Sequence, residues 1–187
     1  MTTAKDILDM IKEKDVKYVD VRFTDIRGKM QHVTFDIDLV DDEFLTDGTM
    51  FDGSSIVGWK AINESDMKLR PDLASAYIDP FYQQTTLCLF CDVLNPDTNT
   101  PYNRDPRSIA KAALNYVKSA GIGDTVYFGP EAEFFLFDDV RWSTSGHNTG
   151  YAFDSTELPV NSSKEYAEGN MGHRPGPKGG YFPVNPV

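Results

Sequence analysis

The sequence has few cysteines, an excess of acidic over basic residues and no long apolar run. Only two of its 187 residues are cysteines, which excludes a disulfide-stapled scaffold and favours a reducing compartment. The formal net charge is −11, so no basic stripe is available to bind nucleic acid or an anionic membrane. Apolar runs such as 87–91 fall far short of the about 18 residues that a spanning helix needs, and the first fifteen residues carry alternating charges instead of a secretory signal. We therefore expect a soluble, cytoplasmic protein with no nucleic-acid or membrane partner.

The overall composition is that of a globular protein, with 40% hydrophobic and 12% aromatic residues. Thr3 is placed to cap a helix that ends near Lys14. Alternating apolar residues at 19–23 and 33–37, separated by a turn, predict a hairpin with one buried face. The stretch 41–71 is rich in loop residues, and 86–93 alternates again as a strand. The first hundred residues thus predict a small α+β module.

A turn-rich linker at 95–101 separates this module from a second region. Asp105 as N-cap, Pro106 in the first turn and Gly121 after the last turn predict a helix, whose apolar residues at 109, 113, 116, 117 and 120 should face a core. Residues 126–137 have the pattern of a strand that is interrupted or bulged at Gly129 and Pro130. The expected domains are therefore 1–103 and 104–187. The last 47 residues hold seven glycines and five prolines and show no periodicity, which we interpret as a chain cut partway through its second domain.

Two glutamates, Glu131 and Glu133, lie two residues apart in the predicted strand 126–137. On a strand they would share one face, with Cα atoms about 6.6 Å apart. Carboxylates that project from a core strand are costly unless a cation or partner neutralises them, and this separation suits two adjacent cations such as Mg²⁺. The alternative is an exposed edge strand with solvated glutamates.

Other candidate groups carry weaker signals. Cys88 and Cys91 spell a CxxC motif, but residues three apart on a strand face opposite sides, which favours two small apolar strand residues. The histidines at 32, 147 and 173 have no partner at metal-ligand spacing. Arg174 and Lys178 could meet an anion, but their pattern matches no phosphate-loop spacing, which favours a surface loop. The loop that contains Asp52 is either functional or a plain Asp-Gly turn.

Taken together, several segments resemble one family, the glutamine synthetases, and in particular its bacterial type I members. Five segments carry the resemblance, in matching order and spacing: Phe-Asp-Gly-Ser-Ser at 51–55, Glu-Ser-Asp at 64–66, Asp-Pro-Arg-Ser-Ile-Ala at 105–110, Phe-Gly-Pro-Glu-Ala-Glu-Phe-Phe at 128–135, and Gly-His-Arg-Pro-Gly at 172–176 with Lys-Gly-Gly-Tyr-Phe-Pro at 178–183. The resemblance covers essentially all 187 residues and corresponds to the N-terminal part of the family's enzymes.

The resemblance implies a fold, a reaction and an assembly. The fold would be a β-grasp-like N-terminal domain followed by the truncated start of a catalytic α/β domain. The family condenses glutamate and ammonia to glutamine through a γ-glutamyl phosphate, with ATP as substrate and two Mg²⁺ or Mn²⁺ ions per active site. Type I members form homo-oligomers of two hexameric rings, with active sites between subunits.

The resemblance also implies roles for individual residues. Glu131 would bind the metal nearer the ATP phosphates and Glu133 the metal nearer glutamate. Asp52 would attract ammonium and accept its proton in the neighbouring subunit's site, where Ser55 and Tyr181 would line the same pocket. Trp59, in the same loop, would help close the nucleotide end.

The resemblance leaves much of the family's site outside these 187 residues. The remaining metal ligands, the nucleotide loop and most substrate arginines are expected beyond Val187, so we predict that the chain alone is inactive. The alternative function is a catalytically dead, synthetase-like binding or regulatory module. A thiol oxidoreductase built on Cys88 and Cys91 conflicts with strand geometry.

Overall fold

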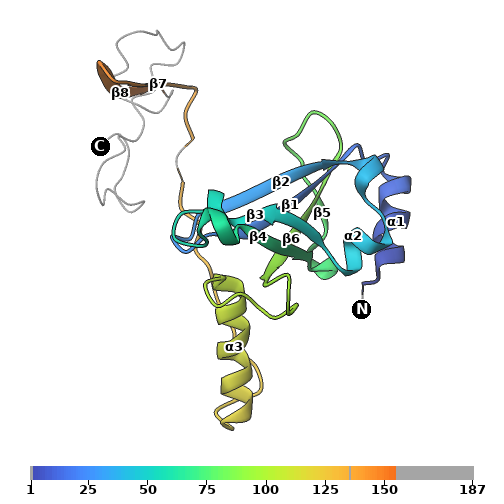
Figure 1. Ribbon diagram of the computed structural model, residues 1–187. Coiled ribbons are helices and arrows are strands. Elements are labelled where there is room, and N and C mark those ends of the chain that lie inside the picture. Colours follow the sequence, from blue (N-terminus) through green and yellow to red (C-terminus); the bar gives the residue numbers. More distant parts are fainter. Residues whose placement is uncertain (1, 135, 155–187) are drawn as a thin grey trace. The chain divides into compact units, whose positions relative to one another are not determined.

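The computed structural model describes residues 2–134 and 136–154, and the chain divides into two units, Met1–Tyr127 and Phe128–Val187, each described here by itself. The first unit contains a six-stranded mixed sheet with the order β2-β1-β6-β4-β3, and β5 pairs with β6 (Figure 1). The strands are β1 (Tyr18–Thr24), β2 (Met30–Asp36), β3 (Thr49–Asp52), β4 (Asp66–Pro71), β5 (Tyr77–Ile78) and β6 (Thr86–Leu94). β1 and β6 are parallel, and the other pairs are antiparallel.

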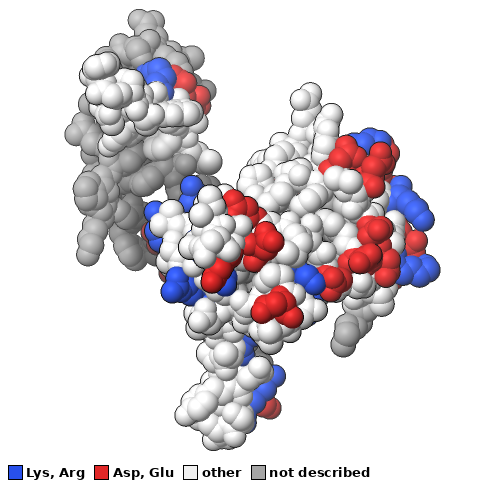
Figure 2. Space-filling view, in the orientation of Figure 1, with Lys and Arg blue, Asp and Glu red and all other residues white. Residues whose placement is uncertain are grey.

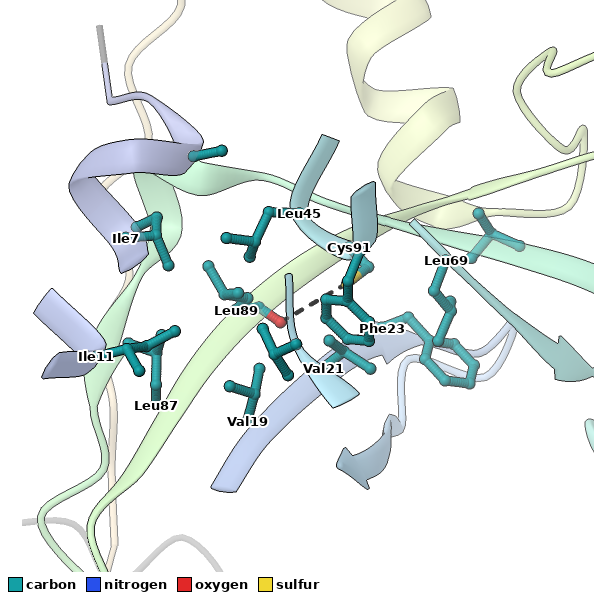
Figure 3. Packing of buried hydrophobic residues seen from close by; sticks show 14 of the residues in the cluster. Ile7, Ile11, Val19, Val21, Phe23, Leu45, Leu69, Leu87, Leu89 and Cys91 are labelled. Atoms are coloured by element: carbon teal, nitrogen blue, oxygen red, sulfur yellow. Dashed lines mark hydrogen bonds between the residues drawn. The ribbon is translucent and has the colours of Figure 1, made fainter. Parts of the chain in front are cut away.

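The core lies between one face of this sheet and two helices, α1 (Ala4–Glu13) and α2 (Asp42–Thr46). Figure 3 shows the apolar side chains of both helices pointing toward those of β1, β4 and β6. The fully buried side chains include Ile7, Leu45, Met67, Leu69, Leu87, Leu89, Val19, Val21 and Val93. Burying each of these contributes about 1.5–3 kcal/mol, so this core is the main source of stability in the first unit.

The predicted first helix is confirmed. The Thr3 hydroxyl accepts a hydrogen bond from the Asp6 amide at 3.2 Å, and the Asp6 carboxylate accepts one from the Thr3 amide at 2.8 Å. This reciprocal capping box satisfies two amides that the first turn leaves without partners. The helix ends at Glu13, next to the expected Lys14.

The predicted hairpin is also confirmed, as β1 and β2. Its turn is built around Asp25, whose side chain is 2% exposed and accepts hydrogen bonds from the Arg27 and Lys29 amides at 2.8 and 3.0 Å. Ile37 departs from the expected alternation, because it starts a 3₁₀ turn (Ile37–Leu39) that the Asp36 side chain caps.

The far face of β1 carries a buried carboxylate, Asp20. It accepts hydrogen bonds from Arg22 Nε and Thr34 Oγ1, each at 2.7 Å, and lies 2.7 Å from Nδ1 of His32. Burial alone would raise the pKa of Asp20, but these hydrogen bonds hold it below its ordinary value. His32 lies on the exposed face of its strand.

The expectation of a loop-rich stretch at 41–71 is wrong. This stretch contains α2, β3, β4 and three short 3₁₀ or turn segments. β4 alternates buried residues at positions 67, 69 and 71 with less buried ones, a period-two signal that the Gly- and Asp-rich surroundings obscured. Asp41 caps α2 by accepting a hydrogen bond from the Phe44 amide at 2.8 Å.

The helix predicted after Asp105 is confirmed as α3 (Pro106–Ser119), with Gly121 at φ +67° just past its end. The expected core against this helix is absent from the described residues, because no residue of α3 is buried. Ile109 and Tyr116 are 56% and 67% exposed. Polar contacts attach its first turns to the sheet instead: Arg107 Nε and Lys111 Nζ donate to Asp92 of β6 at 2.9 and 2.7 Å.

In the second unit, the strand expected at 126–137 does not form. Residues 125–134 and 136–137 have no helix or strand, and the apolar side chains at 128, 134 and 136 are 77–84% exposed. An extended segment becomes a strand only when a neighbouring strand pairs with it, and none of the described strands pairs with this one.

A hairpin follows where no structure was expected. β7 (Asp139–Ser145) and β8 (Asn148–Asp154) pair through a two-residue connection, Gly146 and His147. The aromatic rings of Phe137 and Tyr151 flank that of Phe153, with centroids 4.5 and 5.9 Å away. A two-residue turn that contains glycine, between two segments able to pair, is the sequence signal for this hairpin.

The surface of the described residues is mixed in charge. On the face seen in Figure 2, lysines and arginines are scattered among acidic residues and form no continuous basic surface. Within the part of the chain that is described, none of the helices combines the length and the hydropathy needed to cross a bilayer.

Candidate active site

The candidate site begins at the end of β3, where the chain leaves the sheet. Asp52 is the last residue of this strand and pairs with Asp66 of β4 across the sheet edge. A 3₁₀ turn (Gly53–Ser55) follows at once, and the Asp52 side chain caps it. The carboxylate is therefore fixed to a rigid edge while remaining exposed to solvent.

Serine donors hold the Asp52 carboxylate. Its Oδ1 accepts hydrogen bonds from the Ser54 hydroxyl at 2.6 Å and the Ser54 amide at 2.8 Å, and its Oδ2 accepts one from the Ser55 hydroxyl at 3.0 Å. These hydrogen bonds, those of Ser54 first, lower the pKa of Asp52. The group is thus an anion at neutral pH. Ser55 was predicted beside Asp52, whereas the stronger contribution of Ser54 was not.

The turn after Asp52 depends on close backbone approach. The Gly53 amide donates to the Ser65 carbonyl at 2.7 Å, and a Cβ at Gly53 would lie 2.4 Å from Sδ of the buried Met67. Gly58 has φ +81°, and a Cβ there would lie 2.7 Å from Cδ1 of Ile26. Only glycine fits both positions without displacing a neighbour.

Trp59 closes the same loop from inside the protein. Its side chain is 5% exposed and packs against Phe23, Phe51 and Tyr102, with ring centroids 5.5, 6.1 and 5.5 Å away. The ring therefore faces the core, whereas Asp52 and Ser55 face solvent. Any role of Trp59 toward a nucleotide stays a prediction.

Glu131 and Glu133 belong to the second unit and lie in its segment without helix or strand. The expected common face of a strand is thus not present, because the strand does not form. Both side chains are exposed, and neither has an ion-pair partner among residues 2–134 and 136–154. Their donor chemistry suits a hard divalent cation, yet the described residues bring no group of three or more His, Cys, Asp or Glu together as a metal site.

The remaining candidates divide between the two parts of the chain. Tyr181, Arg174, Lys178 and His173 lie outside the described residues. Cys88 and Cys91 are both buried in β6 and point to opposite faces: Sγ of Cys88 lies 3.8 Å from Asp79, and Sγ of Cys91 lies 3.9 Å from the Leu89 carbonyl within the core (Figure 3). The prediction that they are structural strand residues is confirmed.

Two family models match the chain. Residues 15–96 match the model described as "Glutamine synthetase, beta-Grasp domain", and residues 103–187 match "Glutamine synthetase, catalytic domain". These matches confirm the expected α+β fold class, a β-grasp domain followed by the start of a catalytic domain.

Curated proteins named glutamine synthetase align along the whole chain. Those of Bradyrhizobium diazoefficiens, Rhizobium meliloti and Salmonella typhimurium are 64%, 60% and 57% identical over 186, 187 and 185 residues, respectively. The alignments cover 99–100% of this chain and 39–40% of each relative. The chain thus spans about two fifths of the length of these relatives.

A solved structure described as Plasmodium falciparum glutamine synthetase matches the fold, with a TM-score of 0.70 and 24% identity. The match covers 100% of this chain and 37% of the other. A second structure, titled as a GmaS/ADP complex, matches 64% of this chain with a TM-score of 0.55 and 22% identity. At these identities, both comparisons support the fold alone.

Proposed function

The chain belongs to the glutamine synthetase family, and from this premise we propose that its residues serve the ATP-dependent condensation of glutamate with ammonia to glutamine. Because the chain spans about two fifths of its relatives, the activity is proposed for a full-length synthetase that carries these residues. The observation that carries the proposal is the Asp52 carboxylate, which is exposed at a sheet edge and kept anionic by its serine donors.

We propose that Asp52 attracts ammonium and receives its proton, with Ser55 beside it. An exposed carboxylate with a lowered pKa is a weak base, so it binds the cation mainly through its charge. Ammonium has no lone pair, so its nitrogen attacks the acyl carbon only after ammonium has given one proton to Asp52 and become ammonia. As that nitrogen bonds to the acyl carbon, its remaining protons become strongly acidic, and a weak acceptor then suffices for the second proton. The serine donors fix the orientation of the carboxylate for both steps. Tyr181 is proposed to line the same pocket, which would lie in the neighbouring subunit's site.

The acyl carbon must first be activated, because a carboxylate is a poor acyl donor. The proposed route transfers the γ-phosphoryl group of ATP to the glutamate side chain and gives a γ-glutamyl phosphate, from which ammonia displaces phosphate. Glutamine synthetases generally depend on ATP and divalent metal ions. When bound, such ions neutralise the charge of the phosphoryl group during transfer.

Glu131 and Glu133 are proposed to hold these ions, Mg²⁺ or Mn²⁺, with Glu131 nearer the ATP phosphates and Glu133 nearer glutamate. Two exposed carboxylates without an ion pair in the described residues have the right donor chemistry. Further ligands are proposed to come from water, from phosphate and from residues beyond those described. Trp59 is proposed to support the nucleotide end of the site.

The family is oligomeric, and we propose a homo-oligomer of two hexameric rings in the cytoplasm, with active sites between subunits. In such an assembly Asp52 and the glutamates of one chain would serve different sites.

The test is Asp52→Asn in a full-length synthetase that carries these residues. The amide keeps the size of the side chain and its contacts to Ser54 but removes the charge, so we expect a KM for ammonium raised tenfold or more. The constants for glutamate and ATP should stay near wild type. Initial rates measured while ammonium, glutamate and ATP are varied in turn give the three KM values.

The control is Asp38→Asn, an exposed aspartate in the 3₁₀ turn after β2, which should leave the kinetics unchanged. Unchanged ammonium kinetics in Asp52→Asn would contradict the proposal. If wild type also binds ATP in a metal-dependent way but never turns over, the alternative of a catalytically dead binding or regulatory module is the correct one.

A further inference from the structure

The loop that follows Asp52 is held at its far end by the segment that leads from β6 to α3. We propose that two residues of this segment, Tyr102 and Arg104, are positioning residues for the Asp52 loop, an inference that rests on the function proposed above. They touch neither Asp52 nor Ser55. They act on the backbone carbonyls at which the loop rejoins the protein, Gly58 and Trp59.

The contacts converge on two adjacent carbonyl groups. Arg104 Nη1 donates to the Gly58 carbonyl at 2.5 Å and lies 3.3 Å from the Trp59 carbonyl. The Tyr102 hydroxyl donates to the same Trp59 carbonyl at 3.1 Å, and Tyr102 is 5% exposed. A charged donor and a buried neutral donor thus share one acceptor, which fixes the direction of the chain as it leaves the loop.

The Trp59 ring adds packing but no polar anchor of its own. Its Nε1 atom is buried and has no hydrogen-bond partner among the described residues. The indole is therefore held by packing, which includes the tilted ring of Phe23 and the edge-to-face rings of Phe51 and Tyr102. Packing of this kind constrains the ring less in direction than a hydrogen bond does, so the carbonyl contacts set the position of the loop.

The segment itself is firmly attached to the sheet. The Tyr102 amide donates to the Val93 carbonyl at 2.8 Å. The fully buried Asp105 accepts hydrogen bonds from the Val93 amide at 3.3 Å and from the Ser108 hydroxyl at 2.6 Å. Tyr102 and Arg104 therefore connect the loop to β6 and to the first turn of α3.

This attachment completes the support of the loop. At its start, the Gly53 amide bonds to the Ser65 carbonyl and Asp52 closes its own turn with the serines. At its end, Tyr102 and Arg104 hold the loop through hydrogen bonds to the Trp59 and Gly58 carbonyls. Because the loop is held at both ends, its carboxylate is already oriented before ammonium binds, and no conformational entropy is lost at each turnover. The contacts also join the two matched regions, since Arg104 lies within 103–187 and the loop within 15–96.

The first test measures the attachment directly on this chain. Trp142→Phe leaves Trp59 as the one tryptophan of the sequence, and quenching of its fluorescence by acrylamide reports access to the ring. In that background, we expect Tyr102→Phe and Arg104→Ala to raise the quenching constant about twofold or more, because local opening exposes the indole. The control is Tyr82→Phe, which removes an exposed hydroxyl elsewhere. Quenching equal to that of the control would overturn the proposal.

The second test connects the attachment to ammonium. In a full-length synthetase with these residues, each variant should raise the KM for ammonium about threefold to tenfold, the cost of a hydrogen bond expressed as affinity. The KM values for glutamate and ATP should not change, and Arg104→Lys, which keeps a charged donor, should recover part of the loss. Greater quenching without any change in the ammonium KM would overturn the positioning role while leaving the Asp52 proposal intact. A failure of the Asp52 proposal would instead appear as normal ammonium kinetics in Asp52→Asn.

Discussion

At the residue scale, burial decides the chemistry of the two thiols. Burial raises the pKa of Cys88 to about 11 and raises that of Cys91 further, within the core. The thiolate is the reactive form, so we expect both cysteines to resist a thiol reagent such as DTNB in native buffer at pH 8. Addition of urea should release two fast-reacting thiols per chain. Fast reaction of either thiol before unfolding would contradict the buried strand positions.

Gly53, the residue after Asp52, lies where the packing leaves no room for a side chain. A Cβ at this residue would lie 2.4 Å from Met67 Sδ and 2.6 Å from Met67 Cγ, in a side chain that is fully buried. We expect Gly53→Ala to lower the free energy of unfolding by about 1–3 kcal/mol, the usual cost of overpacking a core. Urea titration followed by circular dichroism measures it.

The matched control for this substitution is Gly129→Ala. Nothing lies within 4 Å of a Cβ at Gly129 in the described residues, so its midpoint of unfolding should stay close to that of wild type. Equal midpoints for the two variants would show that the Met67 side chain can move aside for a Cβ at residue 53 without a measurable loss of stability.

Local signals at this scale could be predicted, while contacts between distant residues could not. The caps formed by Thr3 and Asp105 follow from residue type and spacing along one helix turn. The hydrogen bond from Tyr102 to Trp59 joins residues 43 positions apart. No pattern in the sequence indicates such a pair, because it depends on how β6 returns past the loop.

At the element scale, α3 is attached to the sheet by charge. Asp92, whose side chain is 13% exposed, receives hydrogen bonds from Lys111 and Arg107, and Arg107 also pairs with Asp72. Burial alone would raise the pKa of Asp92, but its two cationic partners hold it below the ordinary value. This stabilisation is therefore complete above the pKa of the unfolded state, about 3.9, and is lost as the pH falls through the lower folded value.

We accordingly expect Asp92→Asn to lower the free energy of unfolding at pH 7 by about 1–3 kcal/mol, the range for hydrogen bonds to charged groups. On going from pH 7 to pH 3, the variant should lose less stability than wild type, since it lacks one of the carboxylates that must be protonated. Urea titrations at both pH values measure the difference. Equal losses in the two proteins would mean that Asp92 contributes nothing to the acid sensitivity.

The same scale shows why some elements escaped prediction. β3 and β4 are short and lie among glycines and aspartates, so their alternation covers too few residues to stand out. The opposite error occurred at 126–137, where the aromatic and apolar residues are typical of a strand but no described strand pairs with the segment. The residue pattern indicates that a segment can be a strand, whereas pairing decides whether it becomes one.

At the scale of the whole molecule, the candidate site residues belong to two units. Asp52 and Ser55 lie in the first, and Glu131 and Glu133 lie in the second. Resemblance to the family predicted a role for all four, since each belongs to a long motif. Their spatial relation does not follow from those motifs, because the proposed active site draws Asp52 and the glutamates from different subunits.

This division leads to a prediction for the chain as it stands: the purified 187 residues should show no synthetase turnover. Phosphoryl transfer between two anions needs cations held by several ligands, and the described residues bring no third carboxylate or histidine to Glu131 and Glu133. The curated relatives named glutamine synthetase are about two and a half times as long. A coupled assay for ADP release, with ATP, glutamate, ammonium and Mg²⁺ at saturation, measures turnover.

In a full-length synthetase, Glu131→Ala and Glu133→Ala should each reduce the rate by about a hundredfold or more, because each would remove a proposed ligand of a charge-neutralising ion. Steady ADP release by the 187 residues, or near-normal rates in both glutamate variants, would place the metal ligands elsewhere.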